Sequence, residues 1–257
     1  MSVSKDDKQL FDQVCHQVME RNCLQQGIGT LSEKTVHAVM KNFYEPNPDN
    51  QEVPIGNYIA DIFQNGEITE IQTRNLNAMR AKLSSFLDQY PVTIVHPIVH
   101  NKWLMWIDEE TGEISTKRKS PKKGTRYDAF FELYKIKMFL DHPHLQICLP
   151  LIDVEEYRML NGWSHDRKRG STRYDRIPTA LVDEIYLGSP ADYICMLPDE
   201  LPAAFTVKDY ASATQLAPRY AGTAINVLRH LHVIEQIGKQ GCAYVYQRVI
   251  DLPSPTE

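Results

Sequence analysis

The chain has 257 residues, of which 42% are hydrophobic and 24% are charged, as in ordinary folded proteins. Its net charge of −5 excludes a uniformly cationic nucleic-acid coat protein. No stretch approaches the roughly 18 apolar residues that a membrane span needs, and the polar start lacks the apolar core of a signal peptide, so we expect a cytoplasmic protein. The five cysteines form no C-x-x-C pair, so we expect reduced thiols without a disulfide framework or a zinc knuckle.

The hydrophobic pattern predicts helices and strands in mixed order over the first 195 residues. Apolar residues at helical spacing predict helices at residues 8–24, from Thr30 or Ser32 to Phe43, at 76–87 and at 127–134. Apolar runs predict strands at residues 57–63, 67–73, 92–98, 103–107 and 145–152. This order of elements is typical of a mixed α/β fold.

Positive charge is concentrated in two short runs. Residues 117–126 hold six basic residues and no acid, and residues 165–176 hold five basic residues and two acids. Both runs are rich in Gly, Ser, Thr, Pro or Lys, so we expect loops, whose mobile cations suit contacts with nucleic-acid phosphates. The alternative is a pair of solvated loops. We assign nucleic-acid contacts in these runs to Lys117, Lys119, Lys122, Lys123, Arg126, Arg167, Lys168, Arg169 and Arg173.

The most informative segment is a predicted hairpin. Asn65-Gly66 lies between two strand-like runs, and a type I′ turn needs positive φ at both central residues. In that register Asp61 lies directly opposite Glu70, and Gln72 points to the same face. Opposed carboxylates destabilise a sheet unless something neutralises them. A bound Mg²⁺ or Mn²⁺ would do so and would activate water for attack on phosphorus. The alternative is an exposed acidic hairpin whose carboxylates pair with nearby lysines.

Residues 30–110 resemble the PD-(D/E)XK nuclease superfamily. A helix with Glu33 precedes the strand that ends in Asp61, the Glu70-Ile71-Gln72 motif, a helix and a strand. The resemblance implies a restriction-endonuclease-like mixed sheet flanked by helices, with Asp61, Glu70 and Glu33 as metal ligands. Gln72 stands where the family most often has lysine, although some restriction endonucleases have a Glu-x-Gln variant. Glutamine orients water but supplies no positive charge, so Lys102 is our candidate for a relocated lysine.

A different pattern begins near Leu201. It predicts a short helix at 207–213, a turn, a longer helix from Pro218 to Leu231, and a glycine-tipped hairpin around residues 238–241. This order resembles a winged helix-turn-helix domain. The resemblance implies DNA binding, although some such domains only mediate protein contacts. The basic residues that we assign to DNA contacts here are Lys208, Arg219 and Lys239.

We therefore expect three segments: an N-terminal helix at residues 1–26, a nuclease-like domain at 27–195 and a winged helix at 201–250. The expected function is a Mg²⁺- or Mn²⁺-dependent DNA endonuclease, with DNA as the partner and no contact with a membrane. Pairing of two chains into a homodimer is left open, and no Walker A or G-x-G-x-x-G motif indicates a nucleotide cofactor. The alternatives are a DNA-binding regulator whose nuclease fold no longer cuts and a protein-interaction module. The expected catalytic residues are Glu33, Asp61, Glu70 and Gln72.

Overall fold

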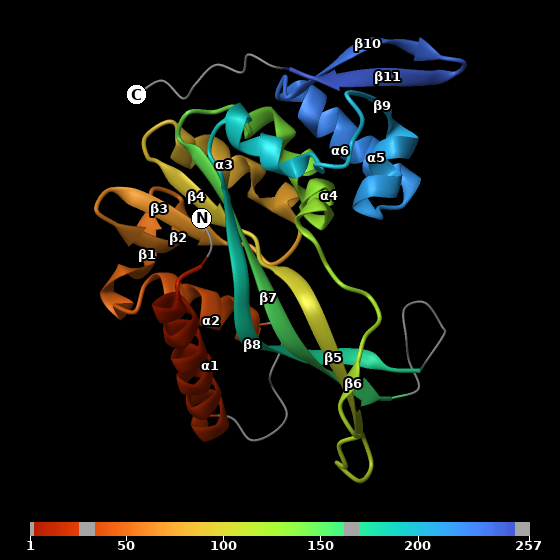
Figure 1. Cartoon of the computed structure of the whole chain (residues 1–257). Helices are drawn as coiled ribbons and strands as arrows, with labels where there is room; N and C mark the ends of the chain where they lie inside the picture. Colours follow the sequence, from red (N-terminus) through yellow and green to blue (C-terminus); the bar gives the residue numbers. More distant parts are fainter. Residues whose placement is uncertain (1–2, 26–33, 162–169, 250–257) are drawn as a thin grey trace.

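A large mixed β-sheet with helices on both faces forms the main body of this α/β protein (Figure 1). The computed structural model describes residues 3–25, 34–161 and 170–249. The order of strands in the sheet is β1-β2-β3-β4-β7-β5-β6, and β4 and β5 follow each other along one edge of β7 while β8 pairs with its other edge. The strands are β1 (Gln51–Ile55), β2 (Tyr58–Gln64), β3 (Glu67–Ile71), β4 (Val92–Val95), β5 (Ile98–Asp108), β6 (Arg118–Lys119), β7 (Leu145–Leu160) and β8 (Thr172–Leu187).

Two hydrophobic clusters lie on opposite faces of this sheet. On one face, α1 and α2 pack against β8 around a cluster that includes Phe11, Val39 and Cys148. The second cluster includes Ile147 and Phe130, together with residues of α3 and α4. Because successive strand residues point to opposite faces, Ile147 and Cys148 place the clusters on the two sides of β7. The helices and 3-10 segments are α1 (Lys5–Gln25), α2 (Lys34–Tyr44), η1 (Pro48–Asn50), η2 (Leu76–Met79), α3 (Arg80–Leu87), η3 (Arg126–Ala129), α4 (Phe130–Leu133), η4 (Tyr134–Phe139) and η5 (Pro190–Met196).

The C-terminal segment forms two helices and a small antiparallel sheet with the strand order β10-β11-β9. Thr206 caps α5 by accepting a hydrogen bond from the Asp209 N–H, while the Asp209 carboxylate accepts one from the Thr206 N–H. Pro218 occupies the first turn of α6, where its missing N–H costs no hydrogen bond. The elements are β9 (Ala204–Thr206), α5 (Val207–Thr214), α6 (Pro218–His230), β10 (Ile234–Gln240) and β11 (Ala243–Arg248).

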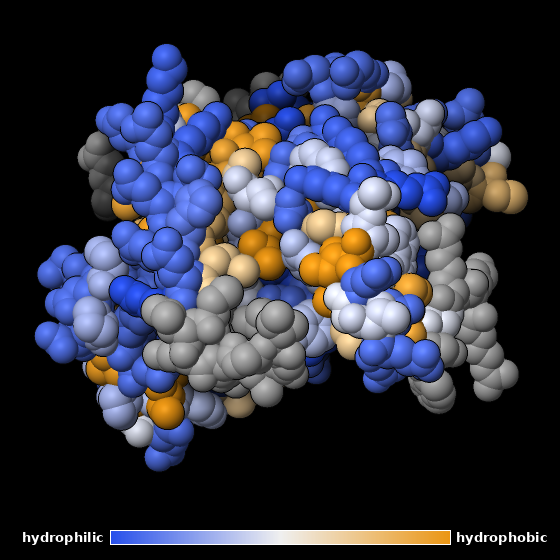
Figure 2. All heavy atoms as spheres, turned by 90° about the horizontal axis from the view of Figure 1, so that it is seen from below, coloured by the Kyte–Doolittle hydropathy of each residue, from blue (hydrophilic) through white to orange (hydrophobic). Residues whose placement is uncertain are grey.

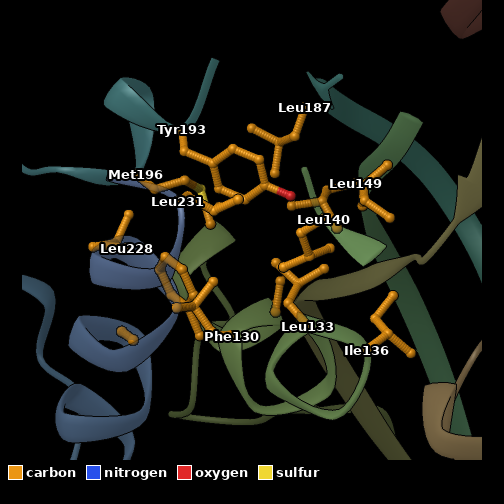
Figure 3. Close-up of a cluster of buried hydrophobic side chains, with 14 of the residues drawn as sticks. Phe130, Leu133, Ile136, Leu140, Leu149, Leu187, Tyr193, Met196, Leu228 and Leu231 are labelled. Carbon is orange, nitrogen blue, oxygen red and sulfur yellow. The ribbon is translucent and has the colours of Figure 1, made fainter. Parts of the chain in front are cut away.

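The C-terminal helices and the main sheet share one hydrophobic cluster. Figure 3 shows the Tyr193 ring of η5 next to Leu187, the last residue of β8, and Met196 of η5 next to Leu231, the residue after α6. Leu228 of α6 and Phe130 of α4 belong to the same cluster. The C-terminal segment is therefore packed directly against the body of the protein.

The face of the molecule seen in Figure 2 is largely hydrophilic. In Figure 2, which views the molecule from below, apolar residues gather mainly in a hollow near the middle of the face. No helix in the described part of the chain is long and apolar enough to cross a membrane.

Most of the predicted elements are present, with different bounds. The long C-terminal helix and both hairpin strands form where they were expected. The strand predicted at residues 92–98 is divided, since β4 ends at Val95 and Pro97, which has no N–H to donate, lies before β5. The start predicted for the second helix, at Thr30 or Ser32, lies outside the described residues.

The prediction of a loop at residues 165–176 is wrong for its last part. Residues 172–176 begin β8, which pairs with β7 so that Arg176 lies opposite Glu156. This carboxylate accepts a hydrogen bond from Arg176 at 2.8 Å, which allows a basic run to continue as a strand. The 117–126 run also contains the two-residue strand β6, which pairs with β5.

The 117–126 run is held against β5 at Gly124. The Gly124 N–H donates to the His100 carbonyl at 2.8 Å, and the Gly124 carbonyl lies 2.9 Å from Nδ1 of His100. A Cβ atom on Gly124 would lie 2.1 Å from the carbonyl oxygen of Val99. Because this neighbour belongs to the backbone, it cannot rotate away, and the contact requires glycine.

We predict that Gly124→Ala lowers the free energy of unfolding by on the order of 2 kcal/mol, because the new methyl group forces the segment away from β5. Gly222 of α6 provides the control, since a Cβ there meets nothing within 4 Å. Gly222→Ala should stabilise the helix by about 0.5–1 kcal/mol. Urea unfolding of both variants measures the difference, and an unchanged midpoint in Gly124→Ala would contradict the close contact.

Candidate functional site

The predicted hairpin turn and its register are confirmed. Strands β2 and β3 pair at Gln64 with Glu67, at Phe63 with Ile68 and at Ile62 with Thr69. Asn65 and Gly66 have φ values of 53° and 83°, as a type I′ turn requires. The next residues along this register are Asp61 and Glu70.

The two strands separate at these acids. From Asp61 back toward Tyr58, β2 pairs with β1, while β3 pairs in parallel with β4 as far as Ile71 and Val95. The Asp61 N–H donates to Oε1 of Glu70 at 3.3 Å, and the Ile71 N–H donates to Oδ2 of Asp61 at 2.8 Å. Each carboxylate thus binds the backbone of the opposite strand and lies at the point of divergence.

Each acid also has a basic neighbour from a helix. Nζ of Lys82, in α3, lies 2.6 Å from Oε2 of Glu70, and Nε2 of His37, in α2, lies 3.3 Å from Oδ2 of Asp61. The side chain of Glu70 is only 5% exposed, so the ammonium group offsets part of the cost of burying its charge. Glu70 therefore has the lysine partner that the sequence left as an alternative, but it is buried and not exposed, and the basic partner of Asp61 is a histidine.

The environment drives the two acidic pKa values apart. Burial and the charge of Asp61 raise the pKa of Glu70 to about 7, against the opposing effect of Lys82. Burial also raises the pKa of Asp61, but the hydrogen bond and charge of His37, the Ile71 N–H and the charge of Lys82 outweigh it and lower the pKa. Near neutral pH, Asp61 is ionised, while Glu70 is divided between its protonated and ionised forms. A bound cation would displace the proton from Glu70.

Gln72 and Lys102 do not lie as the sequence led us to expect. Nε2 of Gln72 donates to the Arg74 carbonyl at 2.5 Å, so its amide supports the turn after β3. Lys102 pairs with Glu156 at 3.4 Å instead of replacing the missing lysine. Lys82 supplies the ammonium group beside Glu70, and sequence reasoning missed it.

The spacing of apolar residues in the predicted helix already indicated that Lys82 faces the sheet. The predicted helix at residues 76–87 buries Met79, Leu83 and Phe86. Lys82 lies three residues after Met79 and four before Phe86, so it shares their side of the helix. A lysine next to a buried stripe indicates a charged group that reaches toward the sheet.

The donor chemistry at the hairpin fits a hard cation. Asp61 and Glu70 offer carboxylate oxygens, and Mg²⁺ or Mn²⁺ needs only one or two protein carboxylates when water and phosphate complete its coordination. Within residues 3–25, 34–161 and 170–249, no three His, Cys, Asp or Glu side chains form a group that could hold a metal. Glu33, the expected third ligand, lies outside the described residues.

Two basic residues of the 117–126 run lie beside an aromatic ring. Nζ of Lys117 and Nζ of Lys119 lie 5.1 and 5.4 Å from the centre of the Trp103 ring. Lys117 also pairs with Glu155, and Nη1 of Arg126 donates to the Cys195 carbonyl at 3.2 Å. Part of this charge is therefore used within the fold.

A cavity of about 620 Å³ separates this run from the turn between α5 and α6. Lys122, Lys123 and Tyr127 line one side, and Leu216 and Tyr220 line the other. Its size is in the range of ligand-binding sites. The cavity brings basic and aromatic side chains from distant parts of the chain together.

The remaining predicted contact residues are dispersed. Arg219 stacks on Tyr220 at 4.5 Å, and Nζ of Lys239 lies 4.8 Å from the Tyr244 ring centre. Lys208 lies in the first turn of α5. Arg167, Lys168 and Arg169 lie outside the described residues.

A buried carboxylate that sequence analysis did not single out gathers four cations, of which one, Arg173, is a predicted contact residue. Glu156 is 1% exposed, and its oxygens lie 2.8 Å from Arg176, 2.9 Å from Arg158, 3.4 Å from Lys102 and 3.6 Å from Arg173. Burial raises its pKa, but the surrounding positive charges and the Arg176 hydrogen bond prevail and lower the pKa to about 2. The ionised carboxylate thus holds β5, β7 and β8 together.

This network predicts a specific dependence of stability on pH. A depressed pKa in the folded state stabilises the fold above the ordinary value of 4.5, and this contribution is lost as pH falls toward 2. We expect wild type to be more stable than Glu156→Gln at pH 7, with the difference shrinking by on the order of 2 kcal/mol between about pH 5 and pH 3. Urea unfolding across this range is the measurement, and a difference independent of pH would contradict the assignment.

Comparison with known proteins places these features in a family. Residues 34–188 match the model described as "Domain of unknown function (DUF8091)", a span that contains Asp61, Glu70, Lys82 and Glu156. A protein of Treponema pallidum (strain Nichols), described as "Uncharacterized protein", is 28% identical over 234 residues, which cover 86% of this chain and 87% of that protein. No solved structure matches the chain significantly. Since the matched span exceeds half of the chain, the protein belongs to the DUF8091 family.

Proposed function

We propose that the protein is a metal-dependent DNA endonuclease. One observation carries the proposal: Asp61 and Glu70 adjoin where β2 and β3 diverge, and Nζ of Lys82 lies 2.6 Å from Glu70. Two carboxylates and an ammonium group at a strand divergence form a compact set of the groups that phosphodiester hydrolysis needs. The pairing of β3 with β4 in parallel, between α2 and α3, is compatible with the restriction-endonuclease-like fold that we propose for this part of the chain.

Each residue of this set has a separate task in the proposed reaction. Asp61 and Glu70 would hold the cation through their carboxylate oxygens, with Glu33 as the proposed third ligand. Bound Mg²⁺ or Mn²⁺ supplies positive charge next to a phosphate and activates water. Lys82 keeps a positive charge beside Glu70, and Gln72 would orient water through its Oε1, because its amide nitrogen is already bound.

The C-terminal segment supports a role in DNA binding. We propose that β9, α5, α6 and the β10–β11 hairpin form a winged helix, with α6 as the helix that meets base edges. Arg219 lies at the start of this helix, as does Tyr220, which lines the cavity opposite Lys122 and Lys123. A strand that enters this cavity would therefore contact both the basic run and the proposed winged helix.

A second candidate is a DNA-binding regulator that does not cut. Lys82 and His37 already lie beside the two acids within the described structure, and the Gln72 amide is bound in a turn. These contacts satisfy the carboxylates without a metal. Direct tests of metal binding and of cleavage distinguish the two candidates.

The first test concerns metal binding. We predict that millimolar Mn²⁺ or Mg²⁺ raises the melting temperature by about 3 °C, because a ligand that binds only the folded state stabilises it. Asp61→Asn should remove most of this shift. Asp49→Asn changes an exposed acid outside the hairpin and should retain it. Differential scanning fluorimetry with and without EDTA measures the shift, and an equal shift in both variants would argue against a site at the hairpin.

The second test concerns cleavage of plasmid DNA in Mg²⁺ or Mn²⁺. We predict that Lys82→Gln lowers the cleavage rate roughly 100-fold or more, because it removes the charge beside Glu70. Lys135→Gln is the matched control, since Lys135 forms a similar pair, with Nζ 2.5 Å from Oε1 of Glu132, which is not one of the hairpin acids. Its rate should stay within about twofold of wild type.

Three outcomes bear on the choice between the candidates. Loss of cleavage in both Lys82→Gln and Asp61→Asn supports the endonuclease. Salt-dependent DNA binding without cleavage in either metal supports the regulator. Cleavage by Asp61→Asn at the wild-type rate rules out the hairpin as the active site.

A further inference from the structure

A second cavity, of about 250 Å³, lies on the other side of Lys122 from the cavity at the α5–α6 turn. Three cationic side chains, Lys102, Lys122 and Arg176, line it, against a single acid, Asp128. Asp128 accepts a hydrogen bond from the Thr125 N–H at 2.9 Å, so it has a structural task of its own. The lining therefore carries an excess of positive charge.

Two of these cations, Arg176 and Lys102, are held in place by ion pairs with Glu156. Its buried carboxylate lies 2.8 Å from Nε of Arg176 and 3.4 Å from Nζ of Lys102. In the described part of the chain, Arg176 bonds only through Nε, which leaves its two terminal nitrogens for another acceptor. An arginine fixed at Nε presents a rigid fork, the geometry that recognises the oxygens of a phosphate.

The third cation is able to close over a bound group. The Lys122 side chain is 80% exposed, and Nζ lies 3.9 Å from Asp128, so it is held only weakly. It reaches the cavity from the segment that Gly124 holds against β5. Fixed cations on one side and a mobile lysine on the other suit an anion that enters from solvent.

The cavity also lies beside the end of the strand that carries Glu70. His96 lines the cavity, and Nδ1 of His96 lies 2.6 Å from the carbonyl oxygen of Gln72 at the end of β3. Burial lowers the pKa of His96, so the ring is neutral at physiological pH and does not add to the positive charge. The three cations alone thus provide the attraction for an anion near the hairpin.

We propose that this cavity binds a phosphate group. An oxyanion with several acceptor oxygens would satisfy the Arg176 fork and both lysines together, and it would relieve the repulsion between them. The phosphate would belong either to a nucleic-acid strand or to a small free molecule. Only the first of these sources rests on the proposed endonuclease function.

The probe for the site itself is inorganic phosphate, in EDTA, at constant ionic strength adjusted with sodium chloride. Isothermal titration calorimetry of wild type should show binding, and Lys122→Ala should weaken it roughly threefold to tenfold, since one charged contact is lost. This exposed side chain is removed without disturbing the core. Lys8→Ala, an exposed lysine on α1, changes the net charge equally and should bind phosphate as wild type does.

A second variant tests the fork. Arg176→Lys retains a positive charge that can pair with Glu156 but presents a single nitrogen, so phosphate affinity should fall roughly threefold or more. Circular dichroism and the melting temperature establish that the variant is folded. Wild type that binds no phosphate, or Lys122→Ala and Arg176→Lys that both bind like wild type, would overturn the proposal.

Short DNA strands, again in EDTA, identify the source of the phosphate. A strand with a 5′-phosphate that binds more tightly than its 5′-hydroxyl counterpart, with the advantage lost in Lys122→Ala, indicates a strand end. Equal binding of both strands, reduced in Lys122→Ala, indicates an internal phosphate. Binding of phosphate without binding of either strand indicates a small free molecule. This outcome supports the phosphate site and contradicts the endonuclease. Conversely, DNA cleavage by a protein that binds no phosphate at this cavity overturns the phosphate site and leaves the endonuclease standing.

Discussion

The pairing of β7 with β4, β5 and β8 is the interaction on which the rest of the structure depends. The first half of β7 is buried on both faces, with Ile147 and Cys148 in opposite hydrophobic clusters. It anchors β4, and through β4 it positions β3 and Glu70. The second half carries Glu156, which gathers cations from β5 and β8. One strand therefore sets the positions of both the acidic hairpin and the basic cavity.

Two buried glutamates, Glu70 and Glu156, have pKa values shifted in opposite directions by their neighbours. Glu70 has one close ammonium partner and a neighbouring carboxylate, so its pKa rises to about 7. Glu156 has a surplus of positive partners, so its pKa falls to about 2. Glu70 therefore takes up a proton near neutral pH, whereas Glu156 stays ionised and holds a surplus of cations around it. The contact between Gln72 and His96 joins the end of β3 to the cavity, so the two sites are neighbours in the fold.

Local signals were sufficient to predict the hairpin and the C-terminal helices. The Asn65-Gly66 turn and the start of α6 at Pro218 depend on residues within a few positions of one another. Lys82 was missed because its partner is 12 residues away on a strand, and the contact exists only once α3 packs on the sheet. The strand at the end of the second basic run was missed for a similar reason, since the carboxylate of Glu156 that permits it lies on another strand.

The shared hydrophobic core limits how DNA would meet the acidic hairpin. Leu228 of α6 and Phe130 of α4 belong to the cluster that also contains Ile68 of β3, two residues before Glu70. If a flexible linker joined the C-terminal segment to the sheet, the distance along the DNA between the bases contacted by α6 and the cleaved bond could vary. Packing of this kind instead fixes α6 relative to β3. If α6 reads a base sequence, the bond that is cut would therefore lie at a constant offset from that sequence, and a change in the packing at Phe130 would alter the offset without touching either site.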